Sequence, residues 1–337
     1  MIKDIKKRIK ARKIIIFLDE INTSKSLATV KLLMCDYNFR KKNNIPDRFV
    51  IICACNPYRV LDNQELQLQF GLTMRNVKQR KLVYTVNPLP YSLLNFIIYF
   101  DKVPKGTRLE YIQKTNEKIN CSNENKQLIN KIESESHEFI SEKGHITSVN
   151  LREIIKFRKF FIFFYEKYNG YRKKNLDQKQ KFKEALALSI YICYYLRFPS
   201  SQLRQEYITI ISIKINDLNY KNQFEKIIQE EINFITDKVL GKRKGYAKNN
   251  LCENLFSEFI CILLREPLII CGKPGSSKSL SVRLLLNAMK GKKSEIEFFR
   301  QFPEVRPSYY QCSLTSTSEN LEKVFKKAKK KLENYKH

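Results

Sequence analysis

The chain has 337 residues, of which 43% are hydrophobic and 12% aromatic, and this composition excludes a wholly disordered protein. The nine Gly and ten Pro exclude collagen-like and Gly- or Pro-rich low-complexity classes. The net charge of +29 raises the question of nucleic-acid binding, but the Lys are spread along the whole chain and the Lys- and Asn-rich, Trp-free composition is also typical of AT-rich coding, so we expect no specific nucleic-acid site.

The first predicted element is a strand at 14–18, because an unbroken run of Ile, Phe and Leu is typical of a strand buried on both faces of a parallel sheet. A helix start signal and an amphipathic stretch follow at 22–40, and a second buried strand is predicted at 49–54. Residues 13–57 are therefore expected to form a β-α-β unit.

Polar side chains follow both strands, at the sheet edge where α/β folds bind ligands. An apolar strand that runs into Asp19 and Glu20 is typical of a Walker B motif, in which Asp19 holds Mg²⁺ through water and Glu20 deprotonates the attacking water. Asn56 would then contact the γ-phosphate and this water. The ordinary alternative for Asp19 and Glu20 is an acidic helix N-terminus, and the ordinary alternative for Asn56 is an Asn-Pro turn.

A further strand is predicted at 82–86, after which the pattern changes. From 91 to 240 apolar residues recur at helical spacing and Gly is almost absent, which predicts about six helices. The clearest are at 151–168 and 182–197. Arg152 begins the first of these and could reach a nucleotide, although an exposed helical Arg paired with Glu is the commoner case.

The α/β pattern returns after a loop at 241–245. The elements expected there are a helix at 251–264, a strand at 267–271, a Gly-rich turn at 272–279, a helix at 280–290, a strand at 309–312 and a basic helix at 318–335.

The Gly-rich turn between a strand and a helix is typical of a P-loop, which binds the phosphates of ATP. Backbone N–H groups would wrap a phosphate at the positive end of the helix dipole, Lys278 would reach the outer phosphates and the Ser279 hydroxyl would ligate Mg²⁺. Ser277 departs from the common pattern, which has Gly there, and its Cβ restricts the backbone. A Ser-rich turn that caps a helix is the ordinary alternative. The candidate phosphate-binding residues are Gly272, Pro274, Gly275, Ser276, Ser277, Lys278, Ser279 and Leu280.

The order of the two motifs is reversed relative to a single ATPase module, in which the Walker A precedes the Walker B. Only 59 residues follow Lys278, and they contain no acidic pair after an apolar run. The chain is therefore expected to join the later part of one module to the first part of the next.

The nine Cys form no C-x-x-C pair and only three His are present, so no zinc site is expected, and the Cys indicate a reducing compartment. The longest apolar stretch, 185–196, is shorter than the about 20 residues that span a membrane. We expect a cytoplasmic chain without a transmembrane segment.

Taken together, the motifs resemble the mysterin family of giant RING-type E3 ubiquitin ligases, which carry a dynein-like row of AAA+ modules. The resemblance covers nearly the whole chain, and Ser277 in place of Gly is the form that this family uses. The segments that carry it are Phe17-Leu-Asp-Glu-Ile-Asn22, Ala54-Cys-Asn-Pro-Tyr-Arg59, Leu82-Val-Tyr84, Pro88-Leu-Pro90, Gly272-Lys-Pro-Gly-Ser-Ser-Lys-Ser-Leu280 and Gln311-Cys-Ser313.

The resemblance implies an α/β plus α-helical fold, in which pieces of AAA+ P-loop NTPase sheets flank a helical lid. Residues 1–90 would be the later part of one large subdomain, 91–240 its lid and connector, and 250–337 the first part of the next module. Asn56 would be the sensor 1 residue and Arg152 a lid arginine.

By the same resemblance, the cofactors are ATP and Mg²⁺, and the partners are neighbouring AAA+ modules and the ubiquitin machinery. The Cys and His content leaves no room for a RING, so ligase activity would belong to a longer parent of which this chain is a fragment.

Three alternatives stay open from the residues. A midasin-like or dynein-like mechanoenzyme is the nearest, although Ser277 and the Cys-Asn-Pro-Tyr-Arg segment disfavour it. A basic nucleic-acid-binding protein with a vestigial P-loop would show a steep salt dependence of binding. An AAA+ remnant that serves only as a scaffold is the third.

Overall fold

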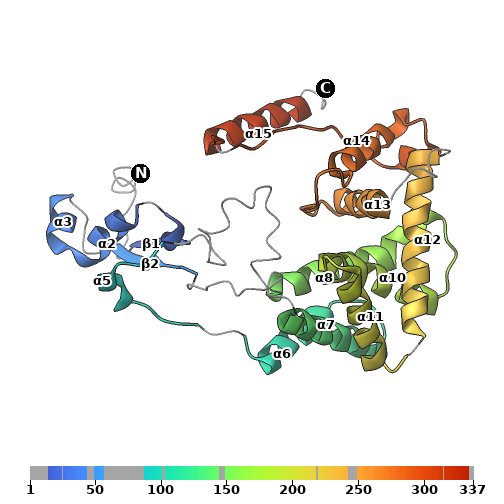
Figure 1. The fold of residues 1–337 in the computed structure, drawn as a ribbon, viewed down its shortest axis with the longest axis horizontal. Helices are drawn as coiled ribbons and strands as arrows, with labels where there is room; N and C mark the ends of the chain where they lie inside the picture. Colours follow the sequence, from blue (N-terminus) through green and yellow to red (C-terminus); the bar gives the residue numbers. More distant parts are fainter. Residues whose placement is uncertain are drawn as a thin grey trace. The chain divides into compact units, whose positions relative to one another are not determined.

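The computed structural model describes residues 14–24, 26–43, 49–56, 87–100, 103–143, 149–217, 219–241, 249–313 and 315–333. The chain divides into two compact units, Met1–Pro104 and Lys105–His337, and each is described by itself. Helices dominate the described residues (Figure 1). The strand predicted at 82–86 lies outside them, as does the loop predicted at 241–245 apart from Gly241.

The described residues of the first unit contain a two-stranded parallel sheet. Strands β1 (Ile14–Leu18) and β2 (Phe49–Cys53) pair in register from Ile14 opposite Phe49 to Leu18 opposite Cys53. The intervening elements are the 3-10 helix η1 (Ile21–Thr23), α2 (Leu27–Cys35) and α3 (Tyr37–Lys42), and α5 (Tyr91–Leu94) follows. The predicted β-α-β unit is confirmed.

The predicted single helix between the strands is divided in two at Asp36. Its carboxylate accepts a hydrogen bond from the Phe39 backbone N–H at 2.9 Å, which is the capping contact that starts a new helix.

Burial alternates along β1. Ile15 and Phe17 are 65% and 59% exposed, whereas their neighbours are partly buried. On β2 the Cys53 Sγ lies 3.7 Å from the Met34 Sδ of α2. The prediction of a strand buried on both faces is therefore wrong for the described part of this unit, because residues next to each other point to opposite faces of the sheet and only one of those faces is covered.

The described residues of the second unit between 105 and 240 are mostly helical. Its longer helices among the described residues are α6 (Lys105–Asn116), α7 (Asn123–Lys143), α8 (Leu151–Phe163), α10 (Gln178–Cys193), α11 (Ser201–Lys214) and α12 (Tyr220–Leu240). The π-helix η3 (Phe164–Tyr168) extends α8 into the short α9 (Asn169–Arg172), and the 3-10 helix η4 (Tyr195–Arg197) follows α10. About six helices were predicted between 91 and 240, and six longer helices form there among the described residues, together with short ones. The predicted range 151–168 is confirmed, whereas the helix predicted at 182–197 begins earlier, at Gln178, and its predicted end is the separate η4.

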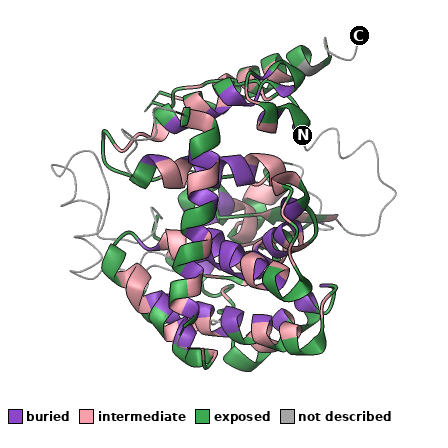
Figure 2. Cartoon of the chain, turned by 90° about the vertical axis from the view of Figure 1, so that its right-hand side faces the viewer, coloured by how far each residue is buried: buried purple, intermediate pink, exposed green. Residues whose placement is uncertain are grey.

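Aromatic side chains at helical spacing explain why these segments pack. Helix α8 begins with a capping box of Asn150 and Glu153 and then turns Phe157 and Phe161 inward. The Phe157 ring stacks on Tyr194 of the segment after α10, at 5.7 Å between centroids. Figure 2 shows the buried residues on the faces that the helices turn toward one another.

The last part of this unit contains α13 (Asn249–Leu264), α14 (Lys278–Ala288), the 3-10 helices η6 (Gly291–Lys293) and η7 (Glu297–Gln301), and α15 (Ser318–Glu333). The three helices agree with the predicted ones. Helix α13 packs against both α12 and α14.

The predicted strands at 267–271 and 309–312 do not form among the described residues. Leu268 and Ile270 point into a pocket while Ile269 is 88% exposed, which is the alternation of an extended segment. A strand also needs a hydrogen-bonded neighbour, and the described residues supply none here.

Candidate functional site

The turn before α14 contains two residues with a positive φ. Gly275 has φ +78°, and Ser277 has φ 61° and ψ 16°, in the left-handed region. The position at which the common pattern has Gly is therefore the one that needs a positive φ. Ser277 adopts this conformation at a cost of about 1–2 kcal/mol relative to an ordinary backbone.

Gly272 permits a close approach inside the turn. A Cβ at this position would lie 2.6 Å from the Ser276 Oγ. The Lys278 ammonium folds back over the turn and donates hydrogen bonds to the carbonyl oxygens of Gly272 at 2.8 Å and Lys273 at 2.9 Å, and to the Ser276 Oγ at 3.1 Å. The turn thus holds a cation beside the N-terminus of an 11-residue helix.

These features fit the phosphates of a nucleotide. An anion at the turn would meet the Lys278 ammonium, the positive end of the α14 dipole and a backbone that lacks a side chain at Gly272. Ser279, the candidate Mg²⁺ ligand, lies exposed in the first turn of α14.

Helix α13 contacts both the turn and the first part of α14. The Asn254 side chain donates to the Ser276 carbonyl at 3.5 Å, and the Ser281 Oγ lies 2.6 Å from the Glu258 Oε1. Glu258 is only 5% exposed, and burial raises the pKa of its carboxyl to about 7 although the hydrogen bond to Ser281 opposes the shift.

Glu258 was missed by sequence reasoning. Its only signal is a carboxyl among the apolar residues Leu255, Phe256, Phe259 and Ile260, all of which are buried.

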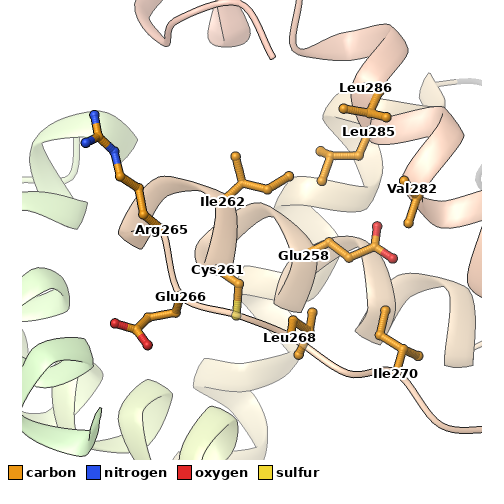
Figure 3. A pocket seen from close by; sticks show the side chains of 10 residues that line it. All are labelled: Glu258, Cys261, Ile262, Arg265, Glu266, Leu268, Ile270, Val282, Leu285 and Leu286. Atoms are coloured by element: carbon orange, nitrogen blue, oxygen red, sulfur yellow. The ribbon is translucent and has the colours of Figure 1, made fainter. Parts of the chain in front are cut away.

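A pocket of about 320 Å³ opens beside Glu258. Figure 3 shows the Glu258 carboxyl directed toward Val282 and Ile270, whereas Arg265 and Glu266 on the rim point the other way. The remaining lining residues are apolar or a thiol: Cys261, Ile262, Leu268, Leu285 and Leu286.

The first unit brings the acidic pair and Asn56 to one edge of its sheet. Beyond the strands, the Ala54 N–H donates to Leu18 at 2.9 Å and the Ile21 N–H donates to Ala54 at 3.0 Å. These bonds hold the segment after β1 against the segment after β2.

Asn22 joins the two segments directly. Its side-chain amide donates to the Asn56 carbonyl at 2.7 Å, and Asn22 itself is buried. Sequence reasoning used Asn22 only as a helix start signal and missed this contact.

Glu20 also has an unusual backbone, with φ 49° and ψ 45°, and its N–H donates to the Asp19 Oδ1 at 3.0 Å. Left-handed backbone at residues other than Gly is concentrated at functional sites. Asp19 and Glu20 are both exposed at this edge.

Arg152 is exposed in the first turn of α8. Its backbone N–H donates to the Asn150 side chain, and the neighbouring Glu153 accepts from Arg197 at 3.2 Å. In the described part of the chain, no hydrogen bond or ion pair engages the Arg152 guanidinium.

Two further findings concern the described residues as a whole. They contain no group of three or more His, Cys, Asp and Glu arranged to hold a metal ion. None of their helices has the length and apolar character to cross a membrane.

Comparison with known proteins supports the resemblance drawn from the motifs. The family described as the RNF213 AAA domain matches residues 245–337. The E3 ubiquitin-protein ligase rnf213-beta of Danio rerio is 29% identical over 93% of this chain, and the E3 ubiquitin-protein ligases RNF213 of Homo sapiens and Mus musculus are 27% and 28% identical over the same share. This chain resembles a segment of the RNF213, or mysterin, family. It spans 6% to 7% of the length of these relatives.

The RNF213 AAA domain match begins just before α13 and includes the whole of the candidate P-loop. The acidic edge of the first unit lies outside that match.

Proposed function

We propose that this chain is an ATP-binding AAA+ segment of an RNF213-like E3 ubiquitin ligase, and that residues 272–280 bind the phosphates of ATP. The observation that carries the proposal is the Lys278 ammonium, which lies over a Gly-rich turn at the N-terminus of α14. Phosphate oxygens would replace the carbonyls of Gly272 and Lys273 as its partners. The RNF213 AAA domain match over the same residues supports it.

The residues around Lys278 would make the other contacts with the phosphates and with Mg²⁺. The N–H groups of the turn and of the first turn of α14 would bind phosphate oxygens, and the Ser279 hydroxyl would hold Mg²⁺. The metal, when bound, neutralises charge on the phosphates. Gly272 keeps the turn open because a side chain there would collide with Ser276.

We infer that Asp19, Glu20 and Asn56 form the hydrolytic edge of a different module. Glu20 would remove a proton from the attacking water, Asp19 would hold Mg²⁺ through water, and Asn56 would orient the γ-phosphate and that water. Arg152 is a weaker candidate for a lid arginine. This chain alone is then expected to bind ATP without hydrolysing it.

Ubiquitin transfer, the neighbouring AAA+ modules as partners and a cytoplasmic location are proposals for the whole protein. Ubiquitin transfer rests on the ubiquitin-ligase names of the relatives, of whose length this chain covers a small part. The neighbouring modules rest on the resemblance of the motifs, and the cytoplasmic location rests on the cysteine content.

The test is ATP binding by the 337-residue chain, measured by calorimetry with Mg²⁺ present. Lys278→Ala should weaken binding more than 10-fold, since it removes the cation that meets the phosphates. Lys273→Ala is the matched control: this neighbouring Lys is exposed and contributes only its backbone carbonyl, so its loss should change affinity less than about 2-fold. Equal affinities for wild type and Lys278→Ala would contradict the proposal.

The role of Glu20 is testable in a longer parent whose other modules are silent. Glu20→Gln should leave nucleotide bound and slow phosphate release about 10²–10⁴-fold, because the amide cannot accept the proton from water. Unchanged turnover would exclude Glu20 as the base. Multiple-turnover hydrolysis by the 337-residue chain that disappears in Lys278→Ala would contradict the assignment of the two half-sites to different modules.

A further inference from the structure

We propose that Glu258 is a positioning residue of the P-loop, and that its side chain acts as a neutral carboxylic acid that fixes the first turn of α14 through Ser281. The inference rests on the proposed nucleotide site, since it names a residue that shapes that site without touching the nucleotide.

The hydrogen bonds around Ser281 favour the neutral acid. The Ser281 Oγ lies 2.6 Å from the Glu258 Oε1 and 2.8 Å from the Lys278 carbonyl oxygen. A hydroxyl has one hydrogen to donate, and a carbonyl and an ionised carboxylate are both acceptors only. An ionised Glu258 would force Ser281 to divide one hydrogen between two acceptors. A protonated Glu258 donates a hydrogen bond to the Ser281 Oγ, and the Ser281 hydroxyl can then donate its own hydrogen to the Lys278 carbonyl oxygen.

The surroundings of Glu258 also disfavour a charge. Its Oε2 is buried and has no hydrogen-bond partner among the described residues. Burial without a counter-charge favours the neutral form of a carboxyl. In agreement, burial raises the pKa of Glu258 to about 7.

The charged and titratable groups on the neighbouring elements include Lys156 and Lys159 of α8, Arg204 of α11, Asp237 and Lys238 of α12, Glu253, Cys261, Arg265 and Glu266 of α13 and its continuation, and Lys278 and Arg283 of α14. None of them makes an ion pair with Glu258 in the described part of the chain. Lys159 pairs with Glu266 and Arg204 with Glu253. The Lys278 ammonium is committed to the turn.

The position of Glu258 explains what it stabilises. Asn254 and Glu258 are four residues apart and therefore share one face of α13. Asn254 holds the carbonyl of Ser276 and Glu258 holds Ser281, so the two contacts bracket Ser277, the residue with left-handed backbone. A strained residue persists only where its surroundings over-determine it. Helix α13 therefore keeps the turn in the shape that places Lys278.

The first test is backbone hydrogen exchange at residues 277–282 of the 337-residue chain, without nucleotide. Glu258→Ala and Ser281→Ala should each speed exchange there about 3- to 10-fold, and the double variant should add little, because both remove the same link. Glu258→Gln should keep the protection, since a neutral amide can still donate to Ser281. Glu253→Gln is the matched control on the same helix: it breaks the contact with Arg204 and should leave residues 277–282 unchanged.

The second test is the pH dependence of ATP binding. The affinity of wild type should fall about 3- to 10-fold between pH 6 and pH 8 relative to Glu258→Gln, because Glu258 loses its proton in this range and the amide does not. Glu258→Ala should bind ATP about 3- to 10-fold more weakly than wild type at pH 6.

The two tests separate the inference from the proposed function. Wild type that binds no ATP but shows the expected exchange pattern would contradict the nucleotide site and support the positioning role. Exchange at 277–282 that is the same in wild type and Glu258→Ala, or as fast in Glu258→Gln as in Glu258→Ala, would overturn the inference.

Discussion

At the scale of single residues, the turn before α14 shows how a residue other than Gly can occupy a backbone conformation that favours Gly. Ser277 takes the left-handed backbone that Gly would adopt without strain. Its side chain makes no capping hydrogen bond, so the hydroxyl does not compensate for the strain. The strain must therefore be borne by contacts around it.

Ser277→Gly should stabilise the chain by about 0.5–1 kcal/mol. Relief of the left-handed strain is worth about 1–2 kcal/mol, and the greater freedom of Gly in the unfolded chain removes part of that gain. Ser276→Gly is the control, because Ser276 has no positive φ and bonds the Lys278 ammonium, so its replacement should destabilise. Urea unfolding measures both, and a less stable Ser277→Gly would contradict the strain argument.

At the scale of elements, two buried polar clusters hold the helices of the second unit together. In the first, the fully buried Glu231 of α12 accepts hydrogen bonds from the Arg172 Nε at 2.8 Å, the Lys174 Nζ at 2.7 Å and the Tyr168 hydroxyl at 2.8 Å. Burial would raise the pKa of Glu231, but the hydrogen bonds and charges of Arg172 and Lys174 outweigh it and lower the pKa. Glu231 thus ties α12 to the end of the π-helix and to α9.

Glu231→Ala should lower the free energy of unfolding by about 3–5 kcal/mol, because it removes the buried anion that pairs with Arg172 and leaves Lys174 with Glu184 alone. Glu230→Ala, one residue earlier and exposed, should change it by less than about 0.5 kcal/mol. Similar losses in the two variants, by urea unfolding, would show that the cluster does not hold the helices.

The second cluster surrounds Glu133 of α7, which is also fully buried. It accepts from the Asn116 amide at 2.5 Å and the Tyr194 hydroxyl at 3.4 Å, and no cation pairs with it among the described residues. Burial therefore raises the pKa of Glu133 to about 8.

A raised pKa makes stability fall as pH rises, because the folded chain keeps a proton that the unfolded chain releases above its ordinary pKa. The free energy of unfolding should drop by about 3 kcal/mol between pH 5 and pH 8 on account of Glu133. Glu133→Gln should remove this part of the slope, whereas Glu124→Gln, an exposed site on the same helix, should keep it. The measurement is urea unfolding at several pH values in this range. If the free energy of unfolding falls equally steeply with pH in wild type and in Glu133→Gln, the proton at Glu133 is excluded.

At the scale of the whole molecule, the sequence predicted what depends on neighbours in the chain. The β-branched run at 14–18 and the helical spacing after residue 91 were sufficient for the first strand and the longer helices. The left-handed Glu20 and the Asp36 break depend on local backbone contacts that periodicity does not report. The strand predicted at 267–271 fails because a strand is completed by residues distant in the chain.

The residues of the candidate site also differ in whether the sequence could predict them. The turn at 272–279 was predictable because its residues are contiguous, and the acidic edge because parallel strands end together. Glu258 was not, since its partner Ser281 lies 23 residues away and belongs to another helix. The only sequence signal is a lone Glu in an apolar helix face, and this signal does not identify the residue that the Glu contacts.

The charge of +29 is also a property of the whole molecule, and it predicts non-specific rather than specific binding to nucleic acid. The Lys are dispersed, and even in the Lys-rich α15 two of them face Glu, Lys326 at 2.7 Å from Glu322 and Lys329 at 4.0 Å from Glu333. Dispersed cations bind any polyanion by releasing counterions, and they do not read bases.

Fluorescence anisotropy with oligonucleotides of different sequence should therefore give similar affinities at low salt, all of which fall steeply as salt is raised to about 0.2 M. A matched acidic polymer, polyglutamate, should compete as well as nucleic acid does, because only charge is recognised. Binding that survives 0.2 M salt and prefers one sequence would require a shaped site with stacking or base-edge contacts, and would favour a nucleic-acid function over the ATP-binding proposal.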